Sequence, residues 1–129
     1  MQVAFKFRMK DRFDVMLSIT TSNVIAKRQL IDLTGRWEER DGVMVWTTSG
    51  RTSVGWMIEW LKGKALTADQ RVQMKQVEAI LKEWGRLRRG DDRGKLLLSE
   101  KMRRWNDENC VSGRRVGDSA EPISLKGIT

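Results

Sequence analysis

The 129-residue sequence contains no histidine and no tyrosine, and it has a single cysteine and a single proline. Without histidine there is no Ser-His-Asp triad, no histidine general base and no HExxH zinc centre. One cysteine, Cys110, excludes an internal disulfide and a multi-cysteine zinc site. The absence of tyrosine excludes tyrosine-based covalent chemistry, so many common enzyme classes are ruled out at the start.

Long hydrophobic runs are missing as well, since no apolar stretch approaches the roughly 18 residues of a membrane-spanning helix. The first residues alternate apolar and basic side chains and lack the continuous apolar core of a signal peptide. The low cysteine content suits a reducing compartment. No phosphate-binding loop or dinucleotide-binding fingerprint is present. We therefore expect a cytoplasmic protein, or a nuclear one if the source is a eukaryote, with no cofactor and no membrane partner.

Positive charge is what the sequence has in excess. It carries 25 Lys and Arg against 17 Asp and Glu, which gives a formal net charge of +8. The excess is concentrated in residues 64–104, which hold twelve basic and six acidic residues. Such an imbalance favours an anionic partner, and the phosphates of DNA or RNA are the first candidate because binding them releases counterions.

Period-two alternation predicts two β-hairpins. In the first, strands over residues 3–9 and 13–20 are joined by a three-residue loop, and this register sets Arg8 opposite Asp14. In the second, over residues 36–47, the dipeptide Asp41-Gly42 marks a two-residue turn.

Helical spacing of apolar residues predicts helices in the rest of the chain. The longest follows a Thr67-Ala68-Asp69-Gln70 capping box. The first has Ser22 or Asn23 as its N-cap and a weak apolar pattern, so that a strand over Leu30–Leu33 is an alternative. The predicted helices cover residues 22–34, 53–62, 68–89 and 95–106. The sequence thus predicts an α+β fold, a small antiparallel sheet packed against three to four helices with a helical C-terminal half.

Composition also predicts the domain organisation. Residues 1–105 are expected to form a single compact domain, followed by a polar tail or surface-wrapping segment over residues 106–129. Ile123, Leu125 and Ile128 offer a short edge strand in that tail.

A ridge of basic side chains along the long helix is the main candidate binding site. At helical spacing its cations fall within about 60° of the helix circumference. More cations extend the positive region beyond the helix, although many such runs are simply solvated faces. The predicted binding residues are Arg71, Lys75, Lys82, Arg86, Arg88, Arg89, Arg93, Arg103 and Arg104.

Six tryptophans give a second set of candidates. The hairpin register pairs Trp37 with Trp46, and this pair either stacks on bases or a protein partner, or covers the core as a cross-strand pair. We expect Trp56 and Trp60, like Trp84 and Trp105, to belong to the core.

Three functions follow from these features. The leading prediction is a small non-catalytic protein that binds DNA or RNA through the helix ridge, and possible homodimerisation is left open. The first alternative is an inhibitor or adaptor, of the kind encoded by phages and mobile elements, that docks on an acidic protein surface. The second is a metal-dependent nuclease, for which Asp32 with Glu38-Glu39-Arg40, or Glu59 with Lys62, supply fragments of a metal site. The sequence predicts that the chain is not an enzyme.

Overall fold

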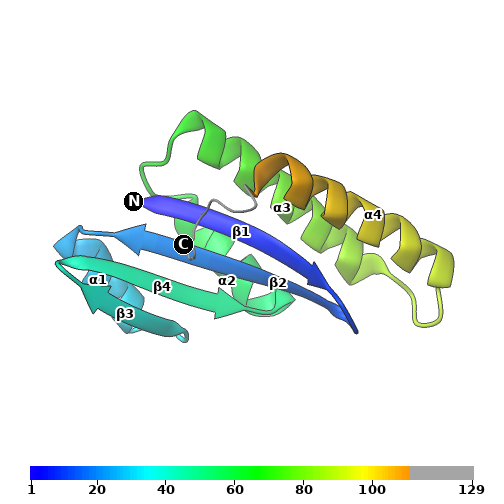
Figure 1. Cartoon of the computed structure of the whole chain (residues 1–129), viewed down its shortest axis with the longest axis horizontal. Helices are drawn as coiled ribbons and strands as arrows, with labels where there is room; N and C mark the ends of the chain where they lie inside the picture. The colour runs from blue at the N-terminus through cyan, green and yellow to red at the C-terminus, as the bar shows by residue number, and fades with distance from the viewer. Residues whose placement is uncertain (111–129) are drawn as a thin grey trace. The chain divides into compact units, whose positions relative to one another are not determined.

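A computed structural model describes residues 1–110. These residues form four strands and four helices, in the order ββαββααα (Figure 1). The elements are β1 (Gln2–Met9), β2 (Phe13–Thr21), α1 (Val24–Ile31), β3 (Arg36–Arg40), β4 (Val43–Ser49), α2 (Arg51–Leu61), α3 (Ala68–Arg86) and α4 (Asp92–Asn109). This is the predicted α+β class, with one antiparallel sheet and a helical C-terminal half.

The four strands form one sheet in the order β1-β2-β4-β3. The first hairpin has the predicted register, in which Arg8 faces Asp14 and their side chains form an ion pair of 2.9 Å. The second pairs Trp37 with Trp46 as predicted. Its turn residues Asp41 and Gly42 both have positive φ, the geometry that an Asp-Gly hairpin turn requires.

One face of the sheet is covered and the other is open. Figure 1 shows α1 and α2 on the far side of the strands. Side chains of alternating residues in β1, β2 and β4 point to that side and are buried. With α2 and α3 they make the core, because period-two strands and period-3.6 helices each present one apolar face. The intervening residues of each strand lie on the open face.

The helix boundaries follow local capping. The side chain of Asn23 accepts a hydrogen bond from the Ala26 amide at the start of α1, so this segment is a helix and not the alternative strand. The capping box of Thr67 and Gln70 is present at the start of α3. However, α3 ends at Arg86 instead of residue 89, and α4 begins at Asp92, so the break lies slightly earlier than predicted.

The chain divides into two compact units, one over Met1–Asp91 and one from Asp92 onward, and they are described separately. Within the second unit, α4 buries Leu98, Met102 and Trp105 along one side. It extends to Asn109, past the predicted end of the domain at residue 105. The proposed edge strand at Ile123, Leu125 and Ile128 lies outside the described residues, and the single-domain organisation stays a prediction.

Candidate nucleic-acid interface

The open face of the sheet carries charged side chains on its edge strands, and both hydroxyl-bearing and apolar side chains on its central strands. The register places Lys6 and Arg8 on edge strand β1, and Arg36 and Arg40 on edge strand β3. The two central strands present mostly small or hydroxyl-bearing residues on this face. These central residues are Met16, Ser18, Thr20, Val43, Val45, Thr47 and Ser49.

Two acidic residues, Asp14 and Glu38, also lie on the open face. Asp14 is already engaged, since one carboxylate oxygen accepts from Arg8 at 2.9 Å and the other from the Val15 amide at 2.8 Å. The face as a whole therefore has four cations against two anions. Its edge strands are three strand spacings apart, which is about 14 Å at about 4.8 Å per spacing.

The predicted basic ridge is exposed on α3 but is not uniform. At its N-terminal end, the guanidinium of Arg71 donates to the carbonyl oxygen of Lys64 at 2.9 Å, a contact that fixes the helix entry. Lys75, Lys82 and Arg86 follow along the same face and are exposed. Arg88 and Arg89 are exposed in the loop after the helix. The ridge thus begins with a structural arginine and ends with freely presented cations.

The remaining predicted cations, Arg93, Arg103 and Arg104, are exposed on α4. They belong to the second compact unit, which is described by itself. Their part in a shared binding surface stays a prediction.

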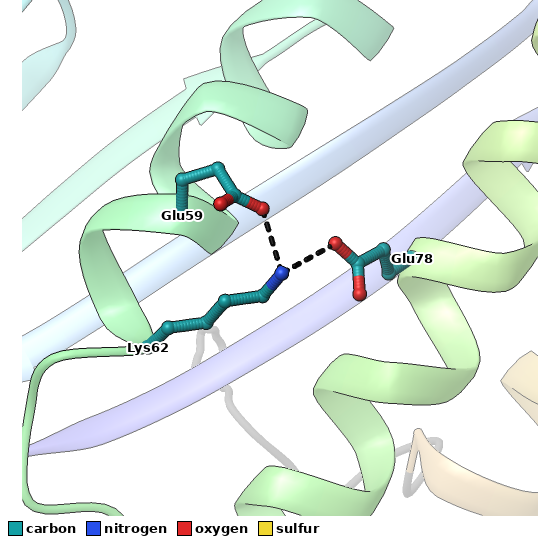
Figure 2. Close-up of polar contacts among 3 residues, drawn as sticks. All are labelled: Glu59, Lys62 and Glu78. Carbon is teal, nitrogen blue, oxygen red and sulfur yellow. Dashed lines mark hydrogen bonds and ion pairs between the residues drawn. The ribbon is translucent and has the colours of Figure 1, made fainter.

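Where α2 meets α3, an ion-pair cluster interrupts the ridge. The ammonium of Lys62 donates to Glu59 at 2.7 Å and to Glu78 at 2.9 Å, so one lysine bridges two carboxylates (Figure 2). The hydrogen bond from Lys62, with its positive charge, lowers the pKa of the Glu59 carboxyl, and the same contacts raise the pKa of Lys62. Both shifts favour the charged forms of Glu59 and Lys62 at neutral pH.

The candidate nuclease residues do not assemble into a metal site. Glu38 and Glu39 are neighbours in a strand, so they point to opposite faces of the sheet, and Glu39 accepts from Lys27 of α1 at 2.6 Å. Glu59 does approach a second carboxylate, Glu78, but the Lys62 ammonium already occupies the space between them. No group of three or more metal-ligating side chains occurs within residues 1–110.

The two tryptophans of the second hairpin have different environments. Trp46 is 0% exposed and Trp37 is 45% exposed. Trp46 therefore cannot stack on a base and belongs to the core, as the interpretation of the pair as a cross-strand pair covering the core requires. Trp37 remains accessible.

The prediction that Trp56 belongs to the core is wrong. The buried side of α2 is formed by Val54, Met57, Ile58 and Leu61, which leaves Trp56 65% exposed on the opposite side.

The predicted binding residues did not include the cations of the open face, Arg36 and Arg40 among them. The signal was present, because period-two alternation places both on the side away from Trp37. What the sequence did not reveal is that β3 and β1 are the two edges of one sheet.

The fold is similar to that of known DNA-bound enzymes. Two solved structures match it, both of the homing endonuclease I-CvuI. The first, in complex with a DNA target in the presence of 2 mM Mg and with the DNA not cleaved, has a TM-score of 0.59 and 17% identity over 88% of this chain and 78% of that chain. The second, in complex with its target in the presence of 2 mM Ca, has a TM-score of 0.56 and 17% identity over 89% and 78%.

At this level of identity the match establishes the fold alone. No protein-family profile matches the chain, and no curated protein does. The prediction that the chain is not an enzyme is contradicted, because both structures that share its fold are of a DNA-cleaving enzyme. The prediction rested on the absence of catalytic motifs, and the fold shared with these structures depends on contacts between distant segments that no motif records.

The comparisons bear on the other interpretations too. Both matched structures are complexes of an endonuclease with DNA. They lend no support to RNA binding or to an inhibitor or phage accessory protein. None of the helices in residues 1–110 is both long and apolar enough to cross a bilayer.

Proposed function

We propose that this protein binds duplex DNA with the open face of its sheet. The observation that carries the proposal is the arrangement of that face, with cations on both edge strands and hydroxyl groups between them. The distance of about 14 Å between the edges is close to the about 12 Å width of the major groove. The DNA-bound endonuclease with the same fold supports the choice of partner.

The side chains of the open face suit two kinds of contact, with phosphates at the edge strands and with bases at the central strands. Lys6 and Arg36 would contact phosphates, which position the protein without reading sequence. Ser18, Thr20 and Thr47 between them would face base edges, where a hydroxyl both donates and accepts, and a threonine methyl can contact the methyl group of thymine. Such short side chains read sequence weakly, so we expect DNA binding with modest sequence preference.

The test measures the binding of duplex DNA by fluorescence anisotropy at a series of salt concentrations. It compares the wild-type chain with the variant Lys6→Gln/Arg36→Gln. The plot of log K against log salt has a negative slope, and each lost phosphate contact makes it shallower by about 0.9. The same loss lowers the affinity by about eightfold at about 0.1 M salt. The double variant should therefore bind roughly 60-fold more weakly, with a slope shallower by about 1.8.

The matched control is Arg28→Gln/Lys95→Gln, which removes the same charge from exposed positions of α1 and α4. It should bind like the wild type. Failure of the wild-type chain to bind duplex DNA at 50 mM salt would overturn the proposal. An equal loss in both double variants would show that net charge, and not the open face, is responsible.

DNA cleavage is the second candidate, and the fold shared with an endonuclease is what favours it. Residues 1–110 contain no group of three or more side chains that could together hold a metal ion. The assay is incubation of supercoiled plasmid with the chain and Mg²⁺ or Mn²⁺, with Glu59→Gln in parallel. Cleavage that Glu59→Gln abolishes would assign the metal chemistry to the Glu59 cluster, and cleavage it leaves unchanged would place that chemistry elsewhere.

A further inference from the structure

The tip of the first hairpin and the C-terminal end of α3 lie together. Phe13 is the first residue of β2, directly after the tip loop, and Trp84 is in the last turn of α3. Their rings meet edge to face, with centroids 5.8 Å apart and planes at 86°. Figure 1 shows the β1–β2 tip beside the end of α3. The contact brings the tip cations Lys10 and Arg12 to the end of the helix that carries Arg86.

A third element adds a cation to the same place. Arg51, the first residue of α2, holds its guanidinium 5.8 Å from the centroid of the Trp84 ring. The absence of a side chain at Gly85 makes this position available, because a Cβ there would be 2.8 Å from Nη1 of Arg51. Three segments that are far apart in sequence therefore meet at Trp84, and each of them carries cations.

The cations of these three segments form a set that we call the tip cluster: Lys10, Arg12, Arg51, Arg86, Arg88 and Arg89. All six are exposed, and none forms an ion pair with an acidic side chain of the described residues. The acidic residues of the same segments are Asp11, Glu83 and Asp91.

The three segments together carry six cations and three anions, so their net charge is positive, and an external polyanion relieves the repulsion among the cations. The tip cluster is also continuous with the open face. Lys6 and Arg8 lie on β1, which leads directly into the tip loop. Lys10 in that loop is about 13 Å from Lys6 along the strand direction. Four base pairs of DNA span about the same length, at 3.4 Å each.

We propose that the tip cluster binds the phosphate backbone of duplex DNA on the flank of the segment that the open face covers. This inference rests on the proposed function and extends it, since it assigns the helix end to the same DNA. It also divides the basic ridge of α3: the end at Arg86 contacts DNA, whereas Lys75, eleven residues earlier on the same side of the helix, does not.

The experiment compares two double variants of the full chain in the anisotropy assay, on a mixed-sequence duplex of about 30 base pairs. Arg12→Gln/Arg86→Gln should weaken binding roughly 60-fold at about 0.1 M salt and reduce the salt slope by about 1.8. Arg28→Gln/Lys75→Gln removes the same charge, in part from the same helix face, and should leave both quantities unchanged. Equal behaviour of the two variants would overturn the proposal.

A second variant separates position from charge. Gly85→Ala keeps every cation but displaces the guanidinium of Arg51 from Trp84. It should weaken DNA binding several-fold while the thermal midpoint stays the same or rises, because alanine favours helix over glycine. Unchanged affinity in Gly85→Ala would remove Arg51 from the cluster, and would contradict the proposal as stated.

Failure of this inference is distinguishable from failure of the proposed function. A chain that binds DNA, loses affinity with Lys6→Gln/Arg36→Gln and keeps it with Arg12→Gln/Arg86→Gln retains the open face as the interface and overturns the tip cluster alone. A wild-type chain that binds no duplex overturns both.

Discussion

In the β1–β2 hairpin both strands bury every second side chain, whereas in the β3–β4 hairpin only β4 does so and all five residues of β3 are exposed. The tips differ too. The first carries Lys10 and Arg12 and is held to α3 through Phe13 and Trp84. The second consists of Asp41 and Gly42.

The difference shows that the pairing of strands within a hairpin and the attachment of that hairpin to the helices depend on different interactions. Pairing of both hairpins follows from alternation and turn type. Anchoring of the first depends on apolar burial, while β3 has a single ion pair to α1 among the described contacts, between Glu39 and Lys27. The first hairpin should therefore be the rigid part of the interface, and β3 the adaptable rim.

The largest expected effect tests this contrast in stability. Leu17→Ala, in the fully buried face of β2, should lower the free energy of unfolding by about 2–5 kcal/mol, because it leaves a cavity in the core. Glu38→Ala, on exposed β3, should change it by less than about 0.5 kcal/mol. Urea denaturation measures both, and comparable losses would show that β3 is anchored as firmly as β2.

A smaller effect sharpens the contrast at the base of the second hairpin. A Cβ at Gly35 would lie 2.5 Å from the ring of Trp46 and 2.8 Å from the carbonyl oxygen of Thr47. Gly35→Ala should therefore destabilise the fold by about 1–3 kcal/mol, since the buried ring and the backbone must both shift.

The control for this substitution is Gly55→Ala in α2. A Cβ there meets nothing within 4 Å, so the change should stabilise the helix by about 0.5–1 kcal/mol. A neutral result for Gly35→Ala in the same urea assay would mean that Trp46 is free to move.

The smallest expected effect serves as a reference away from both hairpins. The pKa of Glu59 is lowered from 4.5 by Lys62, so its contribution to stability is present above pH 4.5 and is lost as the pH falls through its folded value. The pKa of Lys62 is raised from 10.5, so its contribution is present below pH 10.5 and is lost above its folded value.

The stability difference between wild type and Lys62→Met should accordingly be flat from about pH 5 to pH 10 and shrink in acid. Because the groups are exposed, the difference itself should be small. Unfolding measured along a pH series checks this, and a difference that grows on acidification would contradict the assigned ion pairs.

Much of the fold could be predicted from local patterns. The three-residue loop of the first hairpin and the Asp-Gly turn of the second determined their registers, and Thr67 with Gln70 defined the start of α3. The position of Trp56 was mispredicted, because α2 contains six large apolar residues and periodicity alone does not say which four of them are buried.

The candidate site was predicted only in part. The cations of α3 were named, but their counterparts at Arg36, Arg40 and the first hairpin tip were not joined to them. Ion pairs such as Lys62 with Glu78 link residues sixteen apart, and no spacing rule predicts such a contact.

By itself the sequence determined the charge excess, the missing catalytic residue types, the strand registers and the helix caps, because each depends on composition or on neighbours a few residues apart. Tertiary structure decided which strands became edges, which tryptophan was buried and which cations share a surface. Those outcomes depend on contacts between distant segments, such as Phe13 with Trp84 and Arg51 beside Gly85, and a linear pattern carries no record of them.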